Sequence, residues 1–173
     1  MSLHTFLASL QDGPDRFRAL VTTLPIEYLI ATEGEGSWSP LQVIAHVTHL
    51  ESFNWVPRLK TALRDCGECF PPLDRTAHET AMADVPLAEM LQRFENLRRE
   101  NLTFVESLAL DASMLERTAI HPELGMVTAG QLIATWSLHD WAHLTQIART
   151  VSKQHKGAAG AWHRYFNVLK LTP

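Results

Sequence analysis

The sequence predicts an all-α protein built as a four-helix bundle. Apolar residues recur at three- and four-residue spacing over most of the chain, and alternating stretches rich in Val, Ile and Thr are nearly absent. Clusters of Pro, Gly and polar residues divide the chain into pieces of helical length. Its 173 residues, 46% of them hydrophobic and 20% charged, suit one globular domain. We expect a single domain over residues 1–173, with a core of about residues 12–155.

The first main helix is expected over residues 14–24. Phe17, Leu20 and Leu24 recur there at helical spacing, so they form one apolar stripe. Apolar residues at similar spacing over residues 3–10 predict a short helical turn before this helix.

The second helix is expected over residues 40–64. Ser39 is a favourable N-cap, and Pro40 then falls at the first helical position, where the missing N–H costs nothing. Pro57 lies inside this span and predicts a kink or a break, because proline cannot supply the backbone hydrogen bond of a helix interior.

A long connection is expected over residues 65–84, which contain two prolines, both cysteines and few apolar anchors. In a helical bundle, such a segment marks a crossover or the edge of a site. A third helix should follow, beginning near Asp84 or Pro86 and reaching about Ala109.

The last long helix is expected over residues 128–153, after a loop at residues 111–127. Thr128 and Gln131 have the spacing of a capping box, which predicts the start of this helix. Glycines then interrupt the chain, and residues 158–170 read as a short fifth helix.

The charge and the cysteine content limit the classes of partner and activity that we expect. A formal net charge of −4 gives no basic excess, so we expect neither nucleic acid nor an anionic membrane as a partner. The sequence has no apolar run of about 20 residues and no basic leader, which favours a cytoplasmic protein. Cys66 and Cys69 lack the βαβ context of a thioredoxin motif, so exposed loop thiols are expected.

The nine histidines are the unusual feature of the composition, and two of them predict a metal site. His139 and His143 are four residues apart, which puts both rings on one face of the last long helix. His46 on the facing helix is the preferred third ligand because it lies on the apolar stripe. His49, on a more polar face, is the competitor. The alternative is that these are hydrogen-bonded core histidines, although burying three imidazoles without a shared ligand is costly.

Further candidates lie near this trio. Trp136 is one turn before His139, so it is the best pocket candidate among the tryptophans. Asp140 and Gln146 could orient the ligands, since a ligating histidine usually donates its other N–H. Asp140 lies about 100° round the helix from its neighbour His139 and should face solvent or another helix.

These motifs together resemble the DinB-like superfamily over about residues 12–149. The family has a Trp-Ser helix start before a first metal histidine, and a His-x3-His pair followed by Gln-Ile on the last long helix. The resemblance implies an up-down-down-up bundle with one long crossover. It also implies His46, His139 and His143 as metal ligands. The matching positions are Trp38, Ser39, His46, His139, His143, Gln146 and Ile147.

Two positions depart from the family pattern. Family members often have Glu where this chain has Gln42 and Asp where it has His49. Neither is a ligand, so the departures affect the surroundings of the metal rather than its binding. Together with Trp38, Trp136, Asp140 and Gln146, these two residues complete the set of second-shell or pocket candidates.

The chemistry expected of this site follows from its ligands. Three neutral imidazoles leave a coordination position open, as in catalytic zinc sites, and zinc is the first guess for the ion. The resemblance makes nickel the second, and it implies a low-molecular-weight thiol as co-substrate and a homodimer. We therefore expect a metal-dependent thiol S-transferase or hydrolase that acts on a small molecule. One rival is a non-catalytic metal- or ligand-binding bundle with a stress-related role, and another is a Cys-x-x-Cys redox protein.

Overall fold

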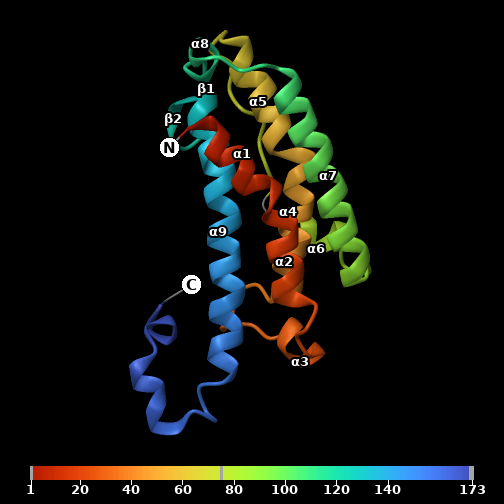
Figure 1. The fold of residues 1–173 in the computed structure, drawn as a ribbon, viewed down its shortest axis with the longest axis vertical. Coiled ribbons are helices and arrows are strands. Elements are labelled where there is room, and N and C mark those ends of the chain that lie inside the picture. Colours follow the sequence, from red (N-terminus) through yellow and green to blue (C-terminus); the bar gives the residue numbers. More distant parts are fainter. Residues whose placement is uncertain (1, 75, 172–173) are drawn as a thin grey trace.

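The computed structural model describes residues 2–74 and 76–171 and shows an elongated helical bundle (Figure 1). Within these residues, four rods run along the long axis. The first and last rods run in one direction and the middle two run in the other, so the chain between the middle rods must return along the bundle (Figure 1). This is the predicted up-down-down-up bundle. The rods are formed by α1 (Leu3–Gln11) with α2 (Gly13–Val21), α4 (Pro40–Phe53) with α5 (Trp55–Arg64), α7 (Leu87–Ser107), and α9 (Ala129–Gln154).

The first rod is longer than predicted. The expected short turn is the nine-residue helix α1, and α2 follows it at once, ending at Val21 rather than at residue 24. Ser2 caps α1 by accepting a hydrogen bond from the backbone N–H of Thr5. A further turn, α3 (Ile26–Leu29), leads into the loop before α4.

The second rod is broken, but not at Pro57. The predicted capping box is present at its start, where Ser39 and Gln42 satisfy each other's backbone N–H groups. The helix ends at Phe53, and Asn54 joins it to α5 with a distorted backbone (φ −112°, ψ −63°). Pro57 lies in the first turn of α5, where its missing N–H has no helical partner to lose, so the break falls upstream of it.

The crossover contains more structure than predicted. Helix α6 (Ala77–Ala81) lies within it and packs against α4, with His78 fully buried. Earlier in the crossover, the backbone N–H of Phe70 donates to the Ile120 carbonyl at 2.8 Å.

The expected loop at residues 111–127 was predicted wrongly, because it contains a helical turn and a hairpin. The turn α8 (Ala112–Leu115) precedes the antiparallel strands β1 (Thr118–His121) and β2 (Gly125–Thr128). The strands are four residues long, too short to show a period-two pattern in the sequence. The hairpin leads directly into α9, whose predicted capping box of Thr128 and Gln131 is present.

The predicted fifth helix is also wrong in type. Residues 158–170 contain two short 3-10 helices, η1 (Gly160–Tyr165) and η2 (Asn167–Lys170), and the chain turns back after α9 so that η2 contacts that helix (Figure 1). No helix in the described part of the chain is long and apolar enough to cross a membrane.

The core consists of two apolar clusters with polar groups between them. One cluster includes Leu102, and the other includes Phe94. Buried Arg98 lies between these two residues on α7, and buried Glu51 and Asp140 face it from α4 and α9. Midway along the bundle, the rods that contain α4, α7 and α9 are therefore joined by charged side chains rather than by apolar contact.

Candidate metal centre

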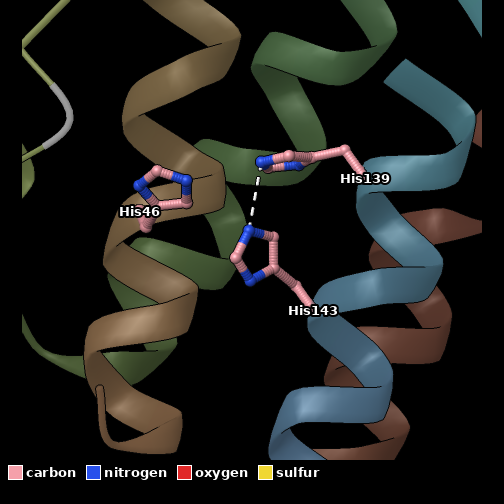
Figure 2. Close-up of side chains that lie close together, drawn as sticks. All are labelled: His46, His139 and His143. Carbon is pink, nitrogen blue, oxygen red and sulfur yellow. Dashed lines mark hydrogen bonds between the residues drawn. The ribbon is translucent and has the colours of Figure 1, made fainter. Parts of the chain in front are cut away.

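Three histidines from two rods converge inside the bundle (Figure 2). His46 extends from α4, and His139 and His143 extend from α9. One ring nitrogen from each lies within 4.8 Å of the others. The helical spacing of the α9 pair and the apolar stripe of α4 predicted this convergence, and the bundle supplies the facing geometry.

The nitrogens of the α9 pair are placed as ligands of one ion would be. His139 Nε2 and His143 Nε2 are 3.0 Å apart. Two imidazole nitrogens bound to one zinc ion at about 2.0–2.1 Å lie roughly 3 Å from each other, so the pair fits a shared divalent ion. On its other side, His143 Nδ1 lies 2.8 Å from the side-chain oxygen of Gln146. This contact makes Nδ1 the protonated nitrogen and leaves the Nε2 lone pair facing His139.

Burial favours the neutral form of the two imidazoles on α9. It lowers the pKa of His139 well below the usual value, and the nearby His143, His46 and Arg98 lower it further. Burial also lowers the pKa of His143, against the opposing effect of its hydrogen bond with Gln146. Because metals bind the neutral form of imidazole, the lowered pKa values of His139 and His143 favour metal binding.

Aromatic side chains enclose the histidines. The Trp38 ring lies over His46 with centroids 4.5 Å apart, and its indole N–H donates to Glu79 at 3.2 Å. His78 of the crossover stands edge-on to both rings, 4.6 Å from Trp38 and 4.9 Å from His46. Trp55 closes the other side, 5.1 Å from His139. These contacts restrict the ring orientations of two of the three histidines.

A cavity of about 410 Å³ opens beside the three histidines, and all three line it. Trp38 and Trp55 also line it, as do residues of the crossover and the hairpin. The cavity is large enough for a small organic molecule, so the imidazoles lie where a ligand could reach them.

Asp140 and Trp136 belong to the core rather than to this cavity. Both oxygens of Asp140 accept hydrogen bonds from Arg98, and the Trp136 indole N–H donates to Glu51 Oε1 at 2.9 Å. The expectation that Trp136 lines a pocket is therefore wrong: it stacks on Trp55, with centroids 5.7 Å apart, and faces the buried ion network. Asp140 faces a neighbouring helix, one of the two positions expected for it.

Gln42 and His49 also lie away from the cavity lining. Gln42 is occupied by the capping box at the start of α4. His49 is buried against Phe53, with ring centroids 4.6 Å apart, and is not part of the three-histidine cluster. Cys66 and Cys69 are exposed and free. Of the candidates around the trio, Trp38 and Gln146 are thus the two that contact its rings.

Sequence reasoning did not predict the buried positions of His78 and Arg98 in this region. Arg98 had a visible signal, since it falls between Phe94 and Leu102 in the apolar stripe of α7 and therefore needed buried acids. The crossover gave no comparable signal for His78, because helix α6 is only five residues long.

Two relatives of the chain have names that mention a metal. A protein of Halalkalibacterium halodurans named "Putative metal-dependent hydrolase BH0277" is 28% identical over 143 residues, covering 80% of each chain. "Putative metal-dependent hydrolase OB0782" of Oceanobacillus iheyensis is 26% identical over 148 residues, covering 84% of this chain and 83% of its own.

A solved structure and a family profile agree with these matches. YfiT from Bacillus subtilis, described as "a probable metal-dependent hydrolase with an unusual four-helix bundle topology", superposes with a TM-score of 0.77. It is 16% identical and covers 89% of this chain and 90% of its own, so it shows that the fold is shared. The profile of the DinB superfamily matches residues 9–147, most of the chain. The resemblance found in the histidine motifs is thus confirmed, and the chain belongs to the DinB superfamily.

Proposed function

We propose that this protein is a metal-dependent hydrolase that uses water as its nucleophile. The observation that carries the proposal is the convergence of three imidazole nitrogens within 4.8 Å on the wall of an open cavity. A structural site would be closed by a fourth protein ligand, whereas three nitrogens leave room for a reactant. The names of the two relatives support hydrolysis.

The three histidines would hold the ion, and Gln146 would orient one of them. When bound, a divalent ion supplies a Lewis acid that lowers the pKa of a water molecule or a thiol, so that a nucleophile forms at neutral pH. Imidazole suits both zinc and nickel, with zinc the first expectation. Gln146 accepts from His143 Nδ1, which keeps the opposite nitrogen available as a ligand.

The cavity lining explains why the nucleophile would come from outside the protein. No Ser, Cys, Lys, Asp or Glu lies among the lining residues that the structure describes. The Thr135 hydroxyl, which does line the cavity, donates to the backbone carbonyl of Gln131 at 2.8 Å. In the hydrolysis, the water oxygen bonds to the electrophilic atom of the substrate, the scissile bond breaks, and a water proton goes to the leaving group.

Thiol transfer is the second candidate, because a lining without side-chain nucleophiles suits an external thiol as well as water. In that reaction the thiol sulfur bonds to the electrophile, and the thiol proton leaves with the displaced group. The names of the relatives favour water as the nucleophile.

Metal analysis tests the site before any substrate is known. We expect about one zinc or nickel ion per chain in protein purified without chelators or a metal-affinity column. The variant with His46, His139 and His143 all replaced by Ala should contain none. The His49→Ala variant is the matched control, since its ring lies on the same helix outside the cluster, and it should keep its metal.

An activity screen then separates the candidates. Ester and amide substrates, assayed with and without an added thiol, should turn over in the metal-loaded protein without a thiol. Turnover only with the thiol would favour transfer. Metal content without turnover in either arm would favour a binding protein, and absence of metal after reconstitution would contradict the metal site itself.

A further inference from the structure

One buried amide in the cavity wall is not used by the fold. Asn54 is 3% exposed, and it lines the cavity beside the three histidines. Its side-chain oxygen Oδ1 is buried and has no hydrogen-bond partner among the residues that the structure describes. A buried acceptor without a partner is costly to the folded state, and nearly all such groups in proteins are paired. The amide of Asn54 therefore needs a reason other than packing.

The backbone at Asn54 explains why this amide does not cap a helix. Asparagine at an N-cap usually accepts a hydrogen bond from the first turn, and it does so from an extended backbone. Asn54 is the N-cap residue of α5, but its backbone lies in the right-handed helical region, and its side chain makes no capping bond within the described chain. Its N–H donates to the Leu50 carbonyl at 3.0 Å, and its own carbonyl accepts from the Arg58 N–H at 3.1 Å. The backbone of Asn54 is thus fully hydrogen-bonded, whereas its side-chain oxygen is unpaired.

Asn54 lies on the same face of the second rod as His46. Residues 46, 50 and 54 are spaced four apart, and all three line the cavity. Eight helical residues, at about 1.5 Å each, separate His46 from Asn54 by roughly 12 Å along the rod. Leu50 lies between them. A ligand that extends along this face therefore meets a histidine of the trio, then an apolar side chain and then the amide.

The amide selects a ligand by hydrogen bonding rather than by charge. A carboxamide is neutral, with an oxygen that accepts and an NH2 group that donates. Rotation about the last side-chain bond is soft, so either end of the group can face the cavity. Because the unpaired atom of Asn54 is the acceptor, a ligand that satisfies it has to supply an N–H or O–H donor. A buried polar group of this kind rejects an analogue without the donor more strongly than apolar walls reject a change of size.

We propose that Asn54 is a specificity-determining residue that binds a neutral hydrogen-bond donor of the substrate. The substrate class is an elongated small molecule with a hydroxyl or amide N–H at one end, an apolar middle against Leu50, and its reacting group at the three histidines. The place of the reacting group rests on the proposed function. The donor preference does not, since it is a property of binding and needs neither metal nor turnover.

The stability of two asparagine variants tests whether the amide is free of a folding role. Asn54→Leu removes an unpaired polar group at nearly constant side-chain size, so the urea midpoint should stay the same or rise. Asn101→Leu is the matched control, because Nδ2 of Asn101 donates to the Glu51 carbonyl at 2.8 Å and to Glu51 Oε2 at 3.0 Å. Both residues have helical backbones, so the gain in helix propensity is similar. The urea midpoint of Asn101→Leu should fall.

Calorimetric titration with matched small molecules tests the donor preference. One pair is phenylbutyramide and its N,N-dimethyl derivative, which lacks the N–H donors, and the other is phenylbutanol and its methyl ether. We expect the donor of at least one pair to bind the wild type at least about tenfold more tightly than its blocked partner. The pair with the larger ratio identifies the amide or the hydroxyl as the preferred donor.

Two variants connect this preference to Asn54. Asn54→Leu should bind both members of the selective pair equally. Thr135→Val should keep the preference, because the Thr135 hydroxyl lines the same cavity but donates to the Gln131 carbonyl at 2.8 Å.

Three results would overturn the inference. A fall in the urea midpoint of Asn54→Leu as large as that of Asn101→Leu would show that the amide serves the fold. Equal binding within both pairs, or no binding of either donor, would remove the donor preference of the wild type. A preference that persists in Asn54→Leu would assign it to another residue of the cavity. Failure of the proposed function would show instead in the metal analysis and the activity screen, with both Asn54 results unchanged.

Discussion

Arg98 and Asp140 form a buried two-point ion pair in the middle of the bundle. Arg98 Nη1 donates to Asp140 Oδ2 at 2.7 Å, and Nη2 donates to Oδ1 at 3.0 Å. Glu51 accepts from the same guanidinium at 2.8 Å, and the Leu10 carbonyl accepts at 2.7 Å. Burial opposes the charge on Arg98, but the two carboxylates outweigh it and raise the pKa of the guanidinium. Since Asp140 follows His139 in α9, this pair sets the rotation at which α9 presents its histidines.

Replacing Arg98 with Met should therefore destabilise the protein strongly. The substitution leaves Glu51 and Asp140 as buried carboxylates without their cation, a loss of roughly 3–5 kcal/mol in the free energy of unfolding. Urea denaturation followed by circular dichroism measures it. Arg99→Met is the control, because Arg99 is exposed and its surface pair with Glu95 is worth about 0–1 kcal/mol. Equal effects of the two substitutions would contradict the structural role of the buried network.

Gly13→Ala should disturb the same network from the first rod. A β-carbon at this position would collide with Asp140 Oδ2 and Arg98 Nη1, which the ion pair holds in place. We expect a loss of about 1–3 kcal/mol in thermal or urea unfolding. Gly157→Ala is the matched substitution, since a β-carbon there meets no atom within 4 Å, and its effect should stay within about 0.5 kcal/mol. A neutral Gly13→Ala would mean that α1 and α2 can move away from the ion pair.

Gln146→Met should weaken metal binding while leaving the fold intact. The change keeps the approximate size of the side chain but removes the oxygen that accepts from His143 Nδ1. Loss of such an orienting partner typically lowers metal affinity by about 10- to 100-fold. Competition with a chromogenic chelator gives the affinity. Thr145→Ala, at the adjacent exposed position, should bind metal as the wild type does, and an unchanged affinity in Gln146→Met would show that His143 needs no orientation.

Glu33 should make the stability of the protein depend on pH. Its side chain is only 1% exposed, and its carboxylate accepts hydrogen bonds from Lys153, Arg149 and Thr150 of α9. Burial acts to raise its pKa, but these hydrogen bonds outweigh it and leave the pKa below the ordinary value of 4.5. A lowered pKa means that Glu33 contributes stability above pH 4.5 and loses it as the pH falls through the folded-state value.

Melting temperatures of the wild type and of Glu33→Gln measure this contribution. The wild type should be the more stable at pH 7, and the gap should narrow as the pH is lowered from 5 to 3. The exposed Glu27→Gln variant should show no comparable gap at either pH. A gap that stays constant through this range would assign the difference to packing rather than to charge.

The sequence was sufficient for the long helices and for the meeting of the histidines, because both depend on local spacing. Ser39 and Thr128 mark the starts of α4 and α9 through their own hydrogen bonds, and the i,i+4 spacing places His139 and His143 together. The spacing could not locate the helix break at Asn54, since nothing in that residue type forces its distorted backbone.

The features that the sequence did not predict depend on contacts between residues that are far apart in the chain. Trp136 lies on the predicted apolar stripe of α9. Its contacts with Glu51 and Trp55 hold it in the core, behind the residues that line the cavity. The hairpin depends on pairing between strands that are individually too short to show alternation. His78 becomes part of the enclosure of the site only because the crossover folds back onto α4.

The crossover lies between the ligands in the chain, although the fold brings them together. His46 precedes it and His139 follows it, more than ninety residues later. An ion shared by these side chains would join the part of the chain before residue 65 to the part after residue 86. Residues 65–86 are the covalent connection between these two parts. A cut by a protease in that segment would therefore leave two fragments held by the metal as well as by their packing. Chelation would then release the pieces of a nicked chain more readily than it unfolds an intact one.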